Sequence, residues 1–253
     1  MKKNILTIRN LEASIEKKKI LNDFHLDIAQ SEIHVLMGPN GSGKSTLSKV
    51  LAGHPAYQIQ KGSIFFQNQN LLDLAPEIRS HEGLFLAFQY PLEIPGLTNY
   101  DFLRIAFNEK RKYWNLPEVT PLEFMQVIQT FLQQLKIKEE FLHRNVNEGF
   151  SGGEKKRNEI LQMLLLQPKL VILDEIDSGL DIDAIKIICD GILENISPET
   201  SLLVITHYPK MITYLKPDFV HIMREGKIIQ TGNVGLVEQL ENFGYDSFCE
   251  KIS

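Results

Sequence analysis

The chain has 253 residues, 43% of them hydrophobic, which suits one large α/β domain better than two independent domains. Its 27 Lys and Arg against 32 Asp and Glu give a formal net charge of −5, and this argues against nucleic acid or an anionic membrane surface as the main partner. Cys189 and Cys249 lie far apart in the chain, so we expect two free thiols in a reducing compartment. No apolar run reaches the ~18 residues of a membrane span, and residues 1–5 carry no apolar leader, so we expect a soluble protein without membrane insertion.

The N-terminal third predicts strands around one helix. Residues 5–8 and 24–28 alternate apolar and polar side chains, as half-buried antiparallel strands do. An apolar run at 33–37 is followed by a glycine-rich loop and then by a helix over 45–53 that ends at a glycine. Residues 62–66 and 85–88 are further strand candidates.

Helical periodicity replaces this pattern between about residues 91 and 147. One helix begins at Thr120 with a capping box to Glu123 and a proline at its first position. Its apolar residues form a single stripe, typical of packing: Phe124, Met125, Ile128, Phe131, Leu132 and Leu135. We expect a helical lobe at approximately 91–147, inserted into a catalytic core of residues 1–90 and 148–253, within one domain spanning 1–253.

Strands and helices alternate in the remainder of the chain. Helices are predicted at 153–167 and 183–195, strands at 170–173 and 201–206, and a hairpin at 219–223 and 227–230. This alternation indicates a parallel sheet with right-handed crossovers.

A phosphate-binding loop follows the apolar run at 33–37. It satisfies the pattern G-x-x-x-x-G-K-[ST] between a strand and a helix. Glycines let backbone N–H groups surround a phosphate, Lys44 neutralises the β- and γ-phosphates, and the Ser45 hydroxyl is a ligand for Mg²⁺. The predicted ATP-binding residues here are Gly38, Pro39, Asn40, Gly41, Ser42, Gly43, Lys44, Ser45 and Thr46.

Two acids end the buried strand at 170–173. Asp174 stands at the carboxyl end of the strand, where open α/β sheets bind their ligands, and we expect it to hold Mg²⁺. Glu175 is then placed to polarise the attacking water.

The segment Phe150-Ser151-Gly152-Gly153-Glu154 resembles the signature motif of ATP-binding cassette proteins. This resemblance implies an α/β fold: a P-loop ATP-binding cassette with an antiparallel β subdomain and an inserted α-helical lobe. It implies that Ser151, Gly152 and Gly153 close over ATP held by a second copy, so that a homodimer forms on ATP binding. Gln89 resembles the glutamine that contacts Mg²⁺, and His207 the switch histidine at the γ-phosphate, which makes Glu175, His207 and Gln89 the catalytic set.

Longer segments resemble SufC, the ATPase family of the SUF iron–sulfur cluster assembly system. They are residues 37–48, 88–96, 149–158 and 177–183. The resemblance implies an ATPase that works with SufB- and SufD-like scaffold proteins, in a bacterial cytoplasm or, for a plastid-encoded chain, in the stroma. Two scattered cysteines do not supply the four ligands of a typical cluster, so a partner would hold it.

Two other functions share the ATP chemistry. The first is the nucleotide-binding subunit of a membrane transporter, which differs in what docks near residues 90–97 and the helical lobe. The second is an ATP-gated interaction module without hydrolysis. Lys44, Asp174, Glu175 and His207 are all present, which argues against this second alternative.

Overall fold

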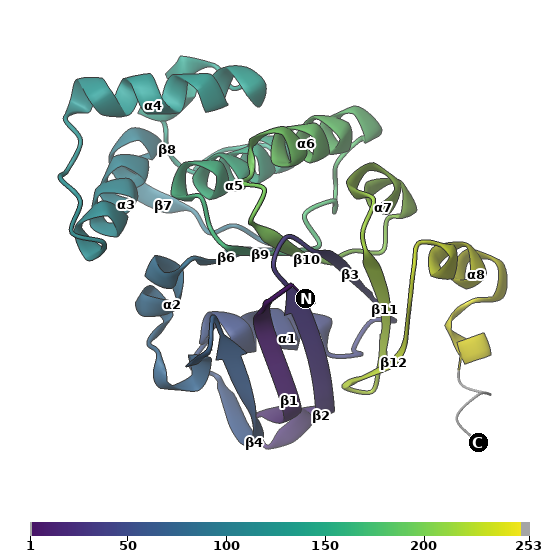
Figure 1. The fold of residues 1–253 in the computed structure, drawn as a ribbon. Helices are drawn as coiled ribbons and strands as arrows, with labels where there is room; N and C mark the ends of the chain where they lie inside the picture. The colour runs from purple at the N-terminus through teal and green to yellow at the C-terminus, as the bar shows by residue number, and fades with distance from the viewer. Residues whose placement is uncertain (1, 249–253) are drawn as a thin grey trace. The chain divides into compact units, whose positions relative to one another are not determined.

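The computed structural model describes residues 2–248, which form two compact units (Figure 1). Within these residues the first unit comprises the chain up to Leu86, Lys169–Glu175 and the chain from Pro198 onward. The second unit comprises Ala87–Pro168 and Ile176–Ser197.

An antiparallel sheet opens the first unit. Its strand order is β2-β1-β4-β5, with the bounds Asn4–Ile15 (β1), Lys18–Ala29 (β2), Tyr57–Phe66 (β4) and Gln69–Asn70 (β5). The strands predicted at 5–8, 24–28 and 62–66 are confirmed, and each is longer than predicted. Glu16 and Lys17, both with positive φ, join β1 to β2 in a tight turn whose twist suits a hairpin.

The second sheet of this unit has six strands in the order β12-β11-β3-β10-β9-β6. β3 runs parallel to both β10 and β11, and β9 runs parallel to β10, so the predicted parallel sheet is confirmed. β12 is antiparallel to β11, as the predicted hairpin requires. The bounds are Ile33–Met37 (β3), Leu84–Ala87 (β6), Leu170–Asp174 (β9), Ser201–Ile205 (β10), Phe219–Arg224 (β11) and Lys227–Gly232 (β12).

The prediction of Phe88 as a buried strand residue is wrong. β6 ends at Ala87, which is fully buried, whereas the Phe88 side chain is 48% exposed. The backbone N–H of Phe88 donates to Glu159 Oε1 at 2.7 Å, so a side chain rather than a strand takes this hydrogen bond.

One hydrophobic core joins the two sheets of the first unit. Helix α1, Lys44–Ala52, contributes Leu47, Val50 and Leu51 to it, and ends at Gly53 as predicted. Further helices not predicted from the sequence are α2 (Pro76–Glu82), α7 (Pro209–Leu215), α8 (Gly235–Phe243) and the short 3-10 turn η3 (Tyr245–Phe248).

The second unit is mostly helical. Its long helices are α3 (Asn99–Tyr113), α4 (Pro121–Gln134), α5 (Gly152–Leu166) and α6 (Ile182–Asn195). A two-stranded sheet joins β7 (Ile94–Thr98) to β8 (Asn145–Val146). α4 has the predicted capping box, and the stripe buries Phe124, Ile128, Leu132 and Leu135 and half-buries Met125 and Phe131.

Three buried asparagines fasten α5 within this unit. Asn158 Nδ2 donates to Asn99 Oδ1 at 2.8 Å and to Asn147 Oδ1 at 3.0 Å. Buried amides are costly unless paired, so this triad fixes the position of α5 against α3 and the end of β8.

Of the two cysteines predicted to be free thiols, the structure describes one. Cys189 is a free, buried cysteine, as predicted, while Cys249 lies outside the described residues. Within residues 2–248, no helix is both long and apolar enough to cross a membrane.

Candidate functional site

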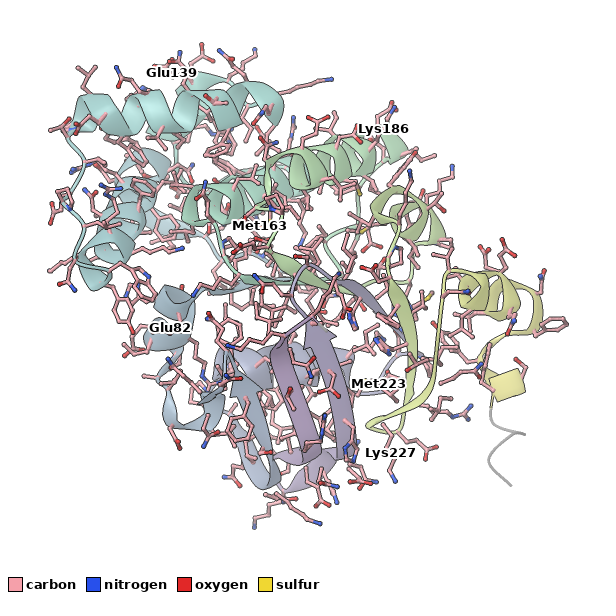
Figure 2. All side chains as sticks on the ribbon, viewed as in Figure 1. Glu82, Glu139, Met163, Lys186, Met223 and Lys227 are labelled. Atoms are coloured by element: carbon pink, nitrogen blue, oxygen red, sulfur yellow. The ribbon has the colours of Figure 1, made fainter. Side chains whose placement is uncertain are left out.

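The phosphate loop occupies the turn between β3 and α1. Gly41 and Gly43 have φ of 79° and 108°, a left-handed backbone that favours glycine and that curls the amides of the loop. Gly38 has no room for a side chain, because a Cβ there would lie 2.2 Å from the carbonyl oxygen of Met223. Met223 is labelled in Figure 2 and belongs to β11, which pairs with β3. The backbone N–H groups of the loop therefore lie next to the N-terminus of α1. Together they make a favourable binding place for an anion.

Lys44 is the first residue of α1, and its side chain lies within the loop. Its Nζ donates to the carbonyl oxygens of Gly38 at 2.8 Å and Pro39 at 3.2 Å. Burial lowers the pKa of Lys44, while the nearby carboxylates of Glu175 and Asp174 raise it. The ammonium is thus held beside the loop amides, where the phosphates of a nucleotide would bind.

Asp174 ends β9 with two hydroxyl donors on its carboxylate. Ser45 Oγ donates to Oδ1 at 3.3 Å, and Ser48 Oγ donates to Oδ2 at 2.6 Å. Burial raises the pKa of Asp174, the neighbouring Glu175 raises it further, and the hydrogen bonds from Ser48 and Ser45 lower it. Ser48 was not predicted, although it lies three residues after Ser45, which places both on one face of α1.

Glu175 adopts a left-handed backbone immediately after β9. Its φ is 49°, uncommon for a residue with a Cβ, and its N–H donates to the carbonyl oxygen of Ile205 at 2.9 Å. Its carboxylate Oε1 lies 3.3 Å from His207 Nε2. Two of the three residues predicted to be catalytic, Glu175 and His207, therefore meet directly, at the carboxyl ends of neighbouring strands β9 and β10.

The signature residues lie in the second unit, at the start of α5. Ser151 is the N-cap: its Oγ accepts from the Glu154 N–H, and Glu154 Oε2 accepts from the Ser151 N–H at 2.8 Å. Gly152 and Gly153 form the first turn, and a Cβ at Gly152 would meet nothing within 4 Å. This exposed helix start is a second surface suited to an anion.

Arg144, also not predicted, braces the signature loop. Its guanidinium donates to Glu154 Oε1 and to the carbonyl oxygen of Gly149, both at 3.0 Å, and lies 4.2 Å from the centre of the Phe150 ring. Glu154 stands at the position of the signature motif that often holds glutamine. Its carboxylate takes part in the capping box with Ser151 and also accepts from Arg144. No sequence pattern links Arg144 to the loop, since the contact depends on how residues 144–150 turn.

The structure brings together only part of the predicted set. Lys44, Ser45, Asp174, Glu175 and His207 converge within the first unit. Gln89, which is half-buried, belongs to the second unit together with the signature residues, and its carbonyl oxygen accepts from Lys156 Nζ at 2.8 Å.

Known proteins resemble this chain in both sequence and fold. Residues 21–178 match the family model of the ABC transporter. A "probable ATP-dependent transporter ycf16" of Cyanophora paradoxa is 54% identical over 97% of this chain and 95% of its own length. An "ABC transporter I family member 6, chloroplastic" of Arabidopsis thaliana is 49% identical over 95% of this chain and 72% of its own length.

A solved structure agrees on the fold. It is an ATP-binding cassette in a dimeric post-hydrolysis state bound to ADP and Pi, and it superposes with a TM-score of 0.77 at 20% identity, over 90% of this chain and 98% of the other. Along the chain the phosphate loop comes first, the signature helix α5 second and the acids at the end of β9 third. The chain belongs to the ABC transporter family, as an ATPase of the ATP-binding cassette type.

Proposed function

We propose that the chain hydrolyses Mg-ATP to power iron–sulfur cluster assembly on a SufB/SufD-like scaffold. The main support is the segment 88–96, whose sequence resembles SufC and whose apolar side chains are presented on the surface of the second unit. ATP hydrolysis is common to the whole family and does not distinguish one partner from another. The segment 88–96 is the feature that bears on which partner binds.

Main-chain hydrogen bonds fix this segment. The carbonyl oxygens of Phe88 and Gln89 accept from Lys156 Nζ at 2.6 and 2.8 Å, and that of Leu92 accepts from Asn147 Nδ2 at 2.7 Å. Glu93 pairs with Lys155 at 2.7 Å. The backbone is therefore held to α5 and to the residue after β8.

The side chains of the same segment remain exposed. Tyr90 is 77% and Leu92 81% exposed, flanked by Phe88 and Ile94. A fixed backbone that presents large apolar side chains suits the core of a protein interface, because little conformational entropy is lost when a partner covers it.

The cysteines also favour a partner that holds the cluster. Cluster iron is bound by thiolates, and burial raises the pKa of Cys189 to about 12, so this thiol is protonated at neutral pH. In the described residues no group of three or more His, Cys, Asp and Glu side chains is placed to hold a metal ion. A cluster ligand set would therefore come from the scaffold.

The residues of the phosphate site fit Mg²⁺ as a partner of ATP. The Ser45 hydroxyl and the Asp174 carboxylate are hard oxygen ligands that lie side by side, 3.3 Å apart. Mg²⁺ binds through one or two such side chains and completes its shell with phosphate oxygens and water. We propose that Ser45, Asp174 and Gln89 hold the ion, that Glu175 polarises the attacking water, and that His207 contacts the γ-phosphate.

We further propose that two copies sandwich ATP, each presenting Ser151, Gly152 and Gly153 to the nucleotide bound by the other. The exposed, capped start of α5 supports this role. We take the whole chain as a single cassette domain that works in a bacterial cytoplasm or a plastid stroma, consistent with the chloroplastic relative.

Affinity purification tests the choice of partner. The tagged chain is purified from its host, and we expect SufB- and SufD-like proteins in the soluble fraction. The variant Tyr90→Ser/Leu92→Ser should lose them, while its isolated ATPase rate stays within about twofold, as usual for surface substitutions. The matched control is Leu122→Ser, because Leu122 on α4 is also largely exposed, at 72%, and this variant should retain both proteins. Recovery of a multi-span permease in place of the scaffold proteins would establish the transporter alternative instead.

A further inference from the structure

A tyrosine from the C-terminal turn reaches the catalytic pair of the first unit. Helix α8 ends at Gly244, whose φ is 70°, and η3 begins at the next residue, Tyr245. Phe248 is buried, and Ser247 Oγ donates to the carbonyl oxygen of Gly244 at 2.8 Å, so the turn is anchored. The half-buried Tyr245 is thereby held in place by its own segment.

The hydroxyl of Tyr245 lies between the switch histidine and the phosphate loop. Its Oη is 3.5 Å from His207 Nδ1, and it shares a hydrogen bond with the backbone of Gly38. Burial raises the pKa of Tyr245, and the hydrogen bond with Gly38 lowers it. A bond that lowers the pKa of a phenol is one that its oxygen accepts, so the Gly38 N–H donates to Tyr245, and the Tyr245 hydroxyl can donate its own proton to His207 Nδ1.

The two ring nitrogens of His207 then have different roles. A neutral imidazole has one donor and one acceptor nitrogen. If Nδ1 accepts from Tyr245, the proton is on Nε2, which lies 3.3 Å from Glu175 Oε1 and can donate to it. The opposite tautomer would direct the Nε2 lone pair at a carboxylate, which is unfavourable.

We propose that Tyr245 is a positioning residue that holds His207 in the tautomer with its proton on Nε2, facing Glu175. The C-terminal turn thus completes the ATPase site from a segment outside the family motifs. This inference concerns hydrolysis alone and does not depend on which protein is the partner.

Nitrogen NMR tests the tautomer directly in the full chain without nucleotide. Long-range ¹H–¹⁵N spectra of ¹⁵N-histidine-labelled protein distinguish the two tautomers, and the His207 signals are assigned by their loss in His207→Gln. We expect a single Nε2–H tautomer in the parent protein. In Tyr245→Phe, which removes only the hydroxyl, Glu175 alone then favours the Nε2–H tautomer, and we expect a minor Nδ1–H population to appear at the same pH.

Steady-state kinetics supply the second readout. We expect Tyr245→Phe to lower kcat about five- to tenfold, the usual effect of one hydrogen bond, with KM for ATP unchanged. The matched control is Tyr214→Phe on α7, which should leave both the spectrum and kcat at parent values. A His207 spectrum identical in Tyr245→Phe and the parent would overturn the proposal, and so would a changed tautomer with an unchanged kcat.

Discussion

Ser48 Oγ donates to Asp174 Oδ2 at 2.6 Å, so a residue one helical turn beyond the phosphate loop fixes the carboxylate expected to hold Mg²⁺. Ser45, inside the loop motif, holds the other oxygen at 3.3 Å. Two hydroxyls on one face of α1 therefore orient both oxygens of a single buried acid.

Removal of the Ser48 hydroxyl should weaken the metal site. In Ser48→Ala the pKa of Asp174 should rise, because the hydrogen bond that lowers it is lost while burial and Glu175 still raise it. We expect the Mg²⁺ concentration for half-maximal ATPase activity to increase about three- to tenfold, the effect of one charge-assisted hydrogen bond. Magnesium titration of the ATPase rate measures this, and Ser48→Thr, which retains a hydroxyl, should recover much of the affinity. An unchanged titration midpoint in Ser48→Ala would contradict this role.

Glu175 and Lys44 should separate hydrolysis from binding. Glu175→Gln removes the base but retains its shape, so ATP binding should remain and turnover should fall by about 10²–10⁴, the range of a general acid–base group. Lys44→Ala should lose ATP binding, because nothing then neutralises the phosphates at the loop. Fluorescent-nucleotide binding and phosphate release distinguish the two variants. Hydrolysis at the parent rate in Glu175→Gln would remove this residue from the mechanism.

Arg144 should affect the signature loop through geometry rather than charge. It bridges Glu154 and the Gly149 carbonyl with two arms of one guanidinium, and lysine lacks this fork. Arg144→Lys should therefore lower kcat about fivefold, equivalent to about 1 kcal/mol, with the fold intact. The control is Arg9→Lys, because the Arg9 guanidinium contacts Asp27 and the carbonyl oxygen of Ile8 at the surface of the first unit, away from the signature loop in sequence. Equal rates for Arg144→Lys and the parent would show that the brace has no effect on turnover.

Dimer formation should require the signature serine. Ser151 is exposed, and an arginine there would place a long cation where the partner's nucleotide is expected. In Glu175→Gln with Mg-ATP we expect light scattering to show a dimer, and the added Ser151→Arg should return a monomer. A monomer at all concentrations of Glu175→Gln, with scaffold proteins also present, would argue against the sandwich.

Features that could be predicted from the sequence differ in physical origin from those that could not. Motifs that depend on local chemistry were predictable: the glycines at 41 and 43, the capping box at Thr120 and the acids after β9. Strand ends were less so, as Phe88 shows, because a side-chain acceptor on α5 captures its N–H. Ser48 and Tyr245 were missed because their roles arise from contacts between elements distant in sequence, which no spacing rule describes. Arg144 was missed because its contacts depend on how residues 144–150 turn.

A buried histidine pair in the first unit predicts the acid sensitivity of the fold. His34 Nδ1 and His221 Nε2 are 2.8 Å apart, and the outer nitrogens contact Glu32 at 3.1 Å and Thr231 at 2.8 Å. Burial lowers the pKa of both rings, and for His221 burial together with the neighbouring His34 lowers the pKa to about 3. Both rings are therefore neutral in the folded state at neutral pH.

The sign of the effect follows from the proton count. Between about pH 3 and 6.5 the unfolded chain binds protons at His221 that the folded chain does not, so the free energy of unfolding decreases as pH falls below 6.5. One such site contributes about 1.4 kcal/mol per pH unit in this window. Urea unfolding between pH 7.5 and 5 should show this slope, and the range lies above the titration of Glu32, whose pKa is lowered from 4.5. His221→Asn should flatten the slope, whereas the exposed His143→Asn should leave it unchanged. A stability that is constant from pH 7.5 to 5 in the parent protein would mean that the pair is not held neutral by burial.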